Sequence, residues 1–170
     1  QPAREFWASI NTLDVKLKHW KAYPSSVKYL QANDMLSENM LITHAVYASR
    51  TDLEILKSHG AKLISCPRSN QYLGNGLPDY DLWQEFNMNW ALGTDSEASN
   101  YNLDLRAEAN AIPNLTARQR FELITSKAAS ILGRHDLGVI QEGTNAEYVT
   151  LEILNNDINL DNCDPFELAM

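Results

Sequence analysis

Three short apolar runs divide the middle of the chain. They cover residues 40–46, 61–66 and 88–92, and Pro67 and Gly93 end the second and third runs. Runs of this length bounded by turn residues are typical of buried strands. Helical patterns separate the runs, and strands that alternate with helices indicate βαβ units in a parallel sheet. The pattern predicts an α/β fold, either part of a doubly wound sheet or part of a barrel.

Apolar residues at helical spacing predict helices on both sides of the first two strands. We expect an amphipathic helix, or two short ones, over residues 6–20, and a short helix capped by Ser25 or Ser26. Thr51 and Glu54 have the spacing of a capping box, and Gly60 is placed as a C-terminal stop. Residues 68–78 are rich in Asn, Gly and Ser and are predicted to form a long loop.

The second half of the chain changes its pattern. Helices are expected over residues 79–86, 103–112 and 116–131, the last with Thr116 and Gln119 as a capping box. Residues 138–143 and 147–153 have the pattern of a hairpin-like pair of strands, and the polar tail from Asn155 is expected to be loop or frayed end. We therefore predict two parts, residues 1–134 as the α/β body and residues 135–170 as a small β element with a tail.

His44 and Asp95 are the first candidates for chemistry. Each falls at or near the C-terminal end of a predicted parallel strand, and in parallel α/β folds the loops that carry functional side chains open at that end. If strand order follows sequence order, both side chains face one opening, where an imidazole and a carboxylate can bind a divalent metal or manage its protons. The alternatives are a core histidine and an aspartate that caps a helix or turn.

Arg68, Ser69 and Asn70 follow the second strand directly and suit contacts to a polar ligand. The alternative is a tight turn in which Asn70 satisfies backbone groups. Gly74-Asn-Gly76 lacks the third glycine of a dinucleotide fingerprint. The sequence contains no G-x-S-x-G, no Walker glycine loop and no P-C-x-x-C with H-x-E, which argues against serine hydrolases, P-loop enzymes and cysteine-ligated zinc deaminases.

Charge and cysteine content narrow the classes of partner. The chain has 14 basic and 22 acidic residues and a net charge of -8, so nucleic acid and anionic membrane are poor partners. No apolar run is long enough to cross a bilayer. Cys66 and Cys163 are far apart and fit two free thiols in a reducing compartment, so we expect a cytoplasmic protein. The chain does not begin with Met, and its true start is expected upstream.

Three segments in this order resemble the amidohydrolase superfamily. They are Leu41-Ile-Thr-His44-Ala-Val, Ser65-Cys-Pro-Arg-Ser-Asn70 with Leu73-Gly-Asn-Gly76, and Leu92-Gly-Thr-Asp95 with Ala98-Ser-Asn100. They are most similar to the branch that contains S-adenosylhomocysteine and methylthioadenosine deaminases, aminodeoxyfutalosine deaminases and triazine chlorohydrolases. The stretch from Ser126 to Gly143 is similar to that branch's closing helix and its return into a small β-sandwich, so the match spans about residues 40–153.

The resemblance implies the C-terminal half of a distorted (β/α)8 barrel, with its sixth, seventh and eighth strands ending near His44, Cys66 and Asp95. It implies that Asp95 is a ligand of a zinc or iron ion and accepts a proton, and that His44 orients the metal-activated hydroxide. The implied reaction is the deamination of an adenosine-derived or related amino-heterocycle, a small-molecule substrate. Ser96 stands where many members have glycine, and Glu147 where they usually have aspartate.

The family's other metal ligands are absent from this sequence. The family takes two histidines from the first strand, and a third histidine with a glutamate from the fifth, and a lone carboxylate cannot hold a catalytic zinc. The resemblance therefore implies a partner, either the missing N-terminal half of the barrel or a second copy that covers the strand edges. The alternatives are a chlorohydrolase or other cyclic-amidine hydrolase on the same scaffold, and a catalytically inactive fragment or binding module.

Overall fold

A computed structural model describes residues 23–145, 147–150, 152 and 163–170. The helix expected over residues 6–20 lies outside these residues. At the centre is a parallel sheet of three strands, β1 (Leu41–Thr43), β2 (Lys62–Ser65) and β3 (Trp90–Leu92), in the order β1-β2-β3. Leu41 pairs with Lys62, and Leu63 pairs with Trp90. The predicted α/β fold with a parallel sheet is confirmed, and the strand order follows the order in the sequence.

The strands are shorter than the apolar runs, and β1 is not buried as we expected. Leu41 is 38% exposed and Ile42 is only half-buried, whereas all three residues of β3 are buried. Among the described residues β1 and β3 are both edge strands, but α6, α7 and α8 contact β3. An edge strand keeps part of its surface in solvent until another element covers it, which is why hydrophobicity alone overestimated the burial of residues 40–46.

Helix α3 (Arg50–Ser58) connects β1 to β2, and its capping box differs from the predicted one. Ser49 is the N-cap and accepts a hydrogen bond from the backbone N–H of Asp52, whose carboxylate in turn accepts from the Ser49 N–H. The capping box therefore consists of Ser49 and Asp52 instead of Thr51 and Glu54. The carboxylate of an Asp three residues after the N-cap makes the same hydrogen bond as that of a Glu. Asp52 also accepts from Ser25, the N-cap of α2 (Ser26–Ala32), so the cap predicted at Ser25 or Ser26 is confirmed.

Two helices lie between β2 and β3, where one helix and a long loop were predicted. Helix α4 (Pro67–Tyr72) starts with Pro67 directly after β2, and α5 (Tyr80–Glu85) follows with Asp79 as its N-cap. The prediction of a loop over residues 68–78 was wrong for its first part. Proline is favoured in the first turn of a helix, because the N–H that it lacks would have no helical partner there. The loop is limited to the residues between Tyr72 and Asp79, where Gly74 and Gly76 both have positive φ.

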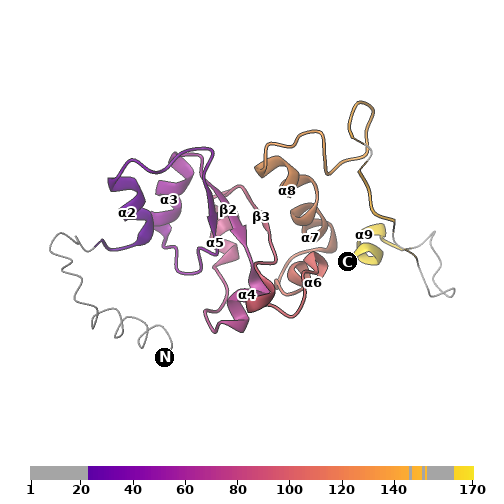
Figure 1. Cartoon of the computed structure of the whole chain (residues 1–170), viewed down its shortest axis with the longest axis horizontal. Coiled ribbons are helices and arrows are strands. Elements are labelled where there is room, and N and C mark those ends of the chain that lie inside the picture. The colour runs from indigo at the N-terminus through magenta and orange to yellow at the C-terminus, as the bar shows by residue number, and fades with distance from the viewer. Residues whose placement is uncertain (1–22, 146, 151, 153–162) are drawn as a thin grey trace.

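The core lies against the sheet and is rich in aromatic rings. Tyr80, Trp83 and Trp90 pack with ring centroids 5.3–5.6 Å apart, two of the pairs edge to face. Leu53 and Leu56 of α3 are fully buried in the same core cluster. In Figure 1 α2 and α3 lie at one end of the sheet, and α6, α7 and α8 lie beside β3.

From β3 to Ile131 the regular elements are all helices. They are η1 (Glu97–Ser99), α6 (Leu105–Asn110), α7 (Ala117–Ile124) and α8 (Ser126–Ile131). The predicted capping box of Thr116 and Gln119 is confirmed. The single helix predicted to reach Ile131 is broken at Thr125, whose backbone leaves the helical region and whose hydroxyl donates to the carbonyl of Phe121. Such a bond offers the chain an alternative to the helical ladder.

The C-terminal part differs most from the prediction. Residues 138–143, expected as a strand, form bends, irregular backbone and a turn, and the described part of residues 147–153 has no strand either. A strand needs a partner for its backbone hydrogen bonds, and none reaches these segments within the described residues. The tail was expected to be irregular, yet α9 (Pro165–Ala169) forms there. The ring of Phe166 packs edge to face against the ring of Phe121 of α7, with the ring centroids 5.5 Å apart.

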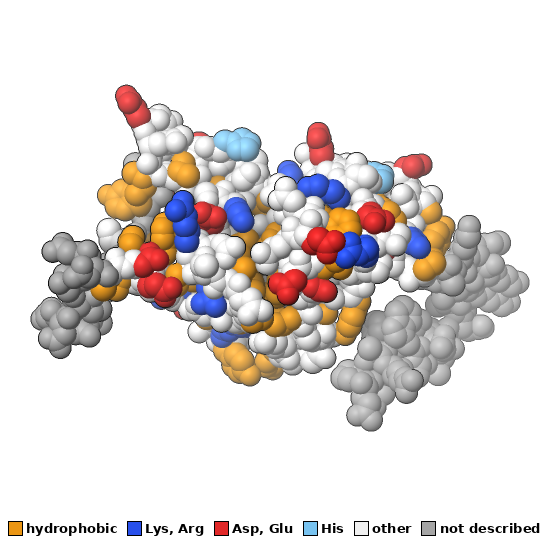
Figure 2. Space-filling model, turned by 180° about the vertical axis from the view of Figure 1, so that it is seen from behind, with side chains coloured by type: hydrophobic (Ala, Val, Ile, Leu, Met, Phe, Trp, Pro, Cys, Tyr) orange, Lys and Arg blue, Asp and Glu red, His pale blue; other side chains and the backbone are white. Residues whose placement is uncertain are grey.

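The described surface carries side chains of both charges. Acidic and basic side chains are interspersed over the face seen in Figure 2 rather than gathered by sign. Within the described residues, no helix combines the length and the apolar character needed to cross a membrane.

Candidate active site

The carboxyl ends of the three strands form one edge of the sheet. The hydrogen-bond ladder ends with the N–H of His44 donating to the carbonyl of Ile64, and with the N–H of Gly93 donating to the carbonyl of Ser65. His44 therefore follows β1 directly, and Asp95 follows β3 after a turn. The parallel ladder brings both loops to the same edge.

Both His44 and Asp95 have a left-handed backbone. Their φ angles are 70° and 59°, values that are uncommon for residues other than glycine and that cost free energy. Gly93 sits between β3 and Asp95, and a Cβ there would lie 3.0 Å from a methyl group of Ile64. The chain therefore turns sharply at the end of both strands, and it does so at the two residues singled out from the sequence.

The side chains of His44 and Asp95 converge. His44 Nε2 lies 3.8 Å from Asp95 Oδ2, and the two side chains are 39% and 31% exposed. They belong to strands that flank β2 on either side, so the predicted arrangement around one opening agrees with the geometry. A pair that is open to solvent and held at this distance can contact a small molecule or ion between its members.

Ser69 and Asn70 lie behind this pair. Both are fully buried in the first turns of α4. The hydroxyl of Ser69 donates to Asp95 Oδ2 at 2.7 Å, and Asn70 Oδ1 lies 2.9 Å from His44 Nδ1. Two adjacent residues after the middle strand thus contact the two candidates from the flanking strands. Their contact with substrate stays a prediction; what the structure gives them is contact with His44 and Asp95.

Hydrogen bonds keep Asp95 ionised. Oδ2 accepts from the hydroxyls of Ser69 and Ser99, and Oδ1 accepts from the N–H of Ser96 at 2.8 Å. These donors, Ser69 first, lower the pKa of Asp95 below its ordinary value. At neutral pH the group is a carboxylate with one face toward solvent, as a metal ligand or proton acceptor requires.

Glu108 is a residue that the sequence reasoning missed. Its side chain is fully buried and accepts from the N–H of Arg68 at 2.9 Å and from Nδ2 of Asn100 at 2.5 Å. It thereby ties the start of α4 to the loop that carries Asp95. The sequence could have predicted this role, because Glu108 lies at helical spacing from Leu105 and Ile112 and so shares the apolar face of the expected helix. A charged side chain on such a face needs hydrogen-bond partners in the core.

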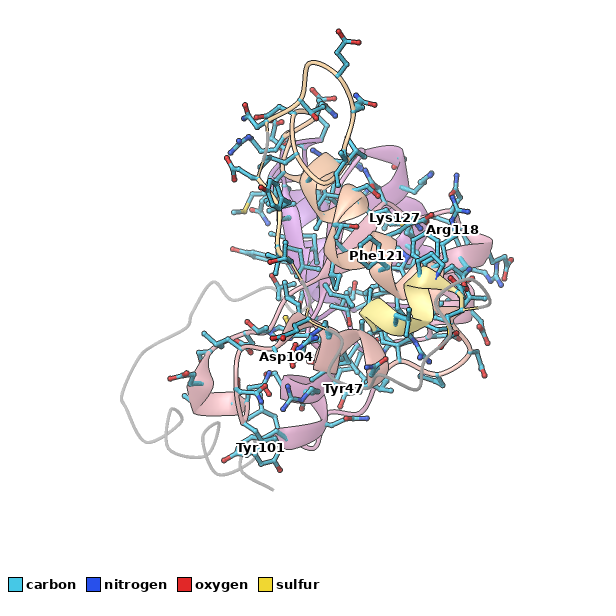
Figure 3. The ribbon with its side chains drawn as sticks, turned by 90° about the vertical axis from the view of Figure 1, so that its right-hand side faces the viewer. Tyr47, Tyr101, Asp104, Arg118, Phe121 and Lys127 are labelled. Carbon is cyan, nitrogen blue, oxygen red and sulfur yellow. The ribbon has the colours of Figure 1, made fainter. Side chains whose placement is uncertain are left out.

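Arg68 also connects α4 to the loop after β3. Its guanidinium donates to Asn102 at 2.7 Å, lies 3.9 Å from Glu108 Oε1, and sits 5.8 Å above the ring of Tyr101. Tyr101 in turn contacts Tyr72 edge to face, with centroids 5.7 Å apart. Figure 3 shows Tyr47 and Tyr101 at the same end of the molecule, away from Arg118 and Lys127. Tyr72 at the end of α4 and Tyr101 after β3 thus pack together, and the hydroxyl of Tyr47 donates to the carbonyl of Asn75.

Cys66 is placed close to this edge but is not a nucleophile. Burial, followed by the charges of Asp95 and Glu108, raises the pKa of its thiol to about 11. At neutral pH it is therefore a thiol, and the thiolate is the reactive form.

A divalent metal fits these residues only in part. Among the described residues no group of three or more His, Cys, Asp or Glu side chains can hold a metal ion. The Asp95 carboxylate is accessible and ionised, with an imidazole beside it, so it suits one position in a metal's coordination shell. Catalytic zinc needs about three protein ligands, so the described residues do not by themselves form a complete zinc site.

Comparison with known proteins agrees with this picture. Residues 16–169 match the model of the amidohydrolase family. This match spans most of the chain, and the chain belongs to the amidohydrolase family.

The relatives are named as deaminases of adenosine derivatives. A 5-methylthioadenosine/S-adenosylhomocysteine deaminase of Caldicellulosiruptor saccharolyticus is 32% identical over 151 residues, which are 82% of this chain and 34% of the relative. One from Pyrococcus abyssi is 30% identical over 165 residues, 86% of this chain and 39% of the relative. These names support the expectation of a hydrolase acting on C–N bonds.

Solved structures extend the comparison. An adenosine deaminase of Xanthomonas campestris with bound zinc matches with a TM-score of 0.65 and 25% identity, over 71% of this chain and 30% of that one. An aminofutalosine deaminase of Helicobacter pylori gives 0.63 and 26%, over 73% and 33%. Atrazine chlorohydrolase of Arthrobacter aurescens in complex with zinc gives 0.62 and 28%, over 70% and 29%. The chain spans about a third of the length of the proteins it matches.

Proposed function

We propose that this chain is the C-terminal part of a metal-dependent hydrolytic deaminase that acts on an adenosine-derived amino-heterocycle. The observation that carries the proposal is the convergence of His44 Nε2 and Asp95 Oδ2, 3.8 Å apart, at the carboxyl edge of the sheet. The names of the relatives favour the adenosine-derived class of substrate. In the overall reaction water adds to the ring carbon that bears the amino group, the C–N bond breaks, and ammonia leaves.

The proposed architecture is part of a (β/α)8 barrel with strands β1 to β3 as its last three. It is supported by the parallel order β1-β2-β3 and by the exposure of Leu41 on an edge strand. The remaining strands and metal ligands then belong to a longer protein or to a separate chain. In the same arrangement residues 135–170 contribute to a small β-sandwich, whose partner strands would cover the exposed apolar residues Ile140 and Val149.

Asp95 is the proposed metal ligand. Two serine hydroxyls and the N–H of Ser96 orient its carboxylate and keep it ionised, so one oxygen is able to bind a cation and to accept a proton. A bound zinc or iron ion supplies a nucleophile at neutral pH by lowering the pKa of a water ligand to about 7. His44 directs Nε2 toward the same space, where it can hydrogen-bond to water or substrate.

The test uses the longer protein that contains this chain. Ammonia release is measured with 5-methylthioadenosine and S-adenosylhomocysteine for the wild type, Asp95→Asn and His44→Gln. Exposed Asp81→Asn and His135→Gln are the matched controls. We expect kcat/KM to fall about 10³-fold or more in Asp95→Asn and about 10²-fold in His44→Gln, with zinc content reduced only in Asp95→Asn. Activity of Asp95→Asn equal to that of Asp81→Asn would refute the proposed site.

A second candidate function is dechlorination of a triazine on the same scaffold, which the similarity to atrazine chlorohydrolase supports. Chloride release from atrazine, measured beside ammonia release from the adenosine derivatives, separates the two. A longer protein that contains no zinc or iron, and that does neither reaction after metal is added, would be a binding module instead.

A further inference from the structure

The side chain of Asn70 is fully buried and is committed to His44. Its Oδ1 lies 2.9 Å from His44 Nδ1, and its Nδ2 finds no hydrogen-bond acceptor among the described residues. Burying an amide costs free energy unless it is hydrogen-bonded. The contact with His44 is therefore the one that offsets the burial of this side chain within the described part of the chain.

This contact decides where the histidine carries its proton. An amide oxygen accepts hydrogen bonds and cannot donate, so His44 Nδ1 has to be the donor. In a neutral imidazole the other ring nitrogen, Nε2, then has a free lone pair. Nε2 faces Asp95 Oδ2 at 3.8 Å, which is too long for a direct hydrogen bond.

We propose that Asn70 is a positioning residue that fixes the Nδ1–H tautomer of His44, so that Nε2 meets water or substrate as a hydrogen-bond acceptor. The role in catalysis rests on the deaminase function proposed above, whereas the tautomer itself does not. Ser69 acts in the complementary sense, because it donates to Asp95. Two adjacent residues of α4 thus orient the two groups, Asn70 by accepting a hydrogen bond from His44 and Ser69 by donating one to Asp95.

The tautomer is measured directly by 15N NMR of the protein labelled at its histidine nitrogens, at alkaline pH, where protonated and unprotonated ring nitrogens give distinct signals. His44→Gln assigns the signals. His59 is the matched reference, since its Nδ1 lies 2.8 Å from the carbonyl oxygen of Ile55 and has to donate as well. We expect His44 to show a protonated Nδ1 and an unprotonated Nε2. A protonated Nε2 in the wild type overturns the inference.

Two variants test whether Asn70 is the cause. Asn70→Asp keeps an accepting oxygen and should keep the Nδ1–H tautomer, whereas Asn70→Leu removes the acceptor and should lose it. In the active longer protein we expect kcat to fall about 10- to 100-fold in Asn70→Leu with KM changed less than about threefold, and to fall less in Asn70→Asp. Exposed Gln71→Ala is the control.

The outcomes separate this inference from the proposed function. If wild-type protein shows the expected tautomer but turns over none of the adenosine derivatives, the proposed function fails and the structural inference stands. If it turns them over while Asn70→Leu keeps the wild-type tautomer and rate, Asn70 has no positioning role.

Discussion

Two regions of the molecule show opposite relations between sequence and burial. In the sheet body, residues 40–131, even polar side chains such as Ser69, Asn70 and Glu108 are fully buried and hydrogen-bonded. In the C-terminal segment, described for residues 132–145 and 147–150, apolar side chains are exposed, with Ile140 at 97% and Val149 at 86%. The contrast teaches that burial follows from the partners available to a segment rather than from its own hydrophobicity.

The largest effect is expected in the aromatic core of the sheet body. Trp83 is 1% exposed and packs against Tyr80 and Trp90. Trp83→Ala should lower the free energy of unfolding by about 3–5 kcal/mol, because it leaves a cavity. Urea-induced unfolding measures the change, with exposed Tyr47→Ala as the aromatic control. Equal effects of the two substitutions would show that the core is not packed as described.

The next largest effect concerns the buried carboxylate. Glu108→Ala leaves the N–H of Arg68 and the amide of Asn100 without their acceptor, and should destabilise the protein by about 2–4 kcal/mol. Glu108→Gln keeps one accepting oxygen and should cost less. The same unfolding assay applies, with exposed Glu85→Ala as control. If Glu108→Ala were tolerated as well as Glu85→Ala, its link between α4 and the Asp95 loop would be energetically unimportant.

A smaller, pH-dependent effect is expected at the start of α3. Burial pushes the pKa of Asp52 upward, but hydrogen bonds from Ser25 and Ser49 outweigh burial and lower it. A lowered pKa means that the stabilisation is present above the unfolded value of about 3.9 and is lost as pH falls through the folded value.

Asp52→Ala should therefore cost about 1–2 kcal/mol at neutral pH. The difference from wild type should shrink as the pH falls below about 4. Unfolding measured across this pH range, with exposed Glu54→Ala beside it, provides the check. A difference that stays constant with pH would mean that the charge of Asp52 contributes nothing.

The smallest effect is expected in the C-terminal segment, and it sharpens the comparison. Ile140→Ser should change the stability of this chain by less than about 0.5 kcal/mol, because the side chain is exposed. In the longer protein the same substitution should cost about 1–3 kcal/mol if the proposed β-sandwich covers Ile140. Equal, negligible effects in both proteins would count against that part of the proposed architecture.

Much of the candidate site was predictable because its signals are local. Short apolar runs and the residues that end them predict strands, and parallel strands bring His44 and Asp95 to one edge whatever lies between them. The cap at Thr116 followed from side-chain spacing alone, and the cap of α2 was narrowed to Ser25 or Ser26. The helix after Pro67 was missed because Ser and Asn favour turns and helix starts alike, so their composition indicated a loop.

The sequence by itself determined the parallel α/β character of the body and placed His44 and Asp95 at the ends of strands, since periodicity and turn residues act over a few neighbours; the order of the strands came from the structure. Only the tertiary structure decided that Ser69 and Asn70 contact Asp95 and His44, that Glu108 joins two loops, and that residues 138–143 form bends, irregular backbone and a turn. Those outcomes depend on contacts between segments that are distant in the sequence, and on which backbone groups find a hydrogen-bond partner. Local sequence patterns do not determine such contacts.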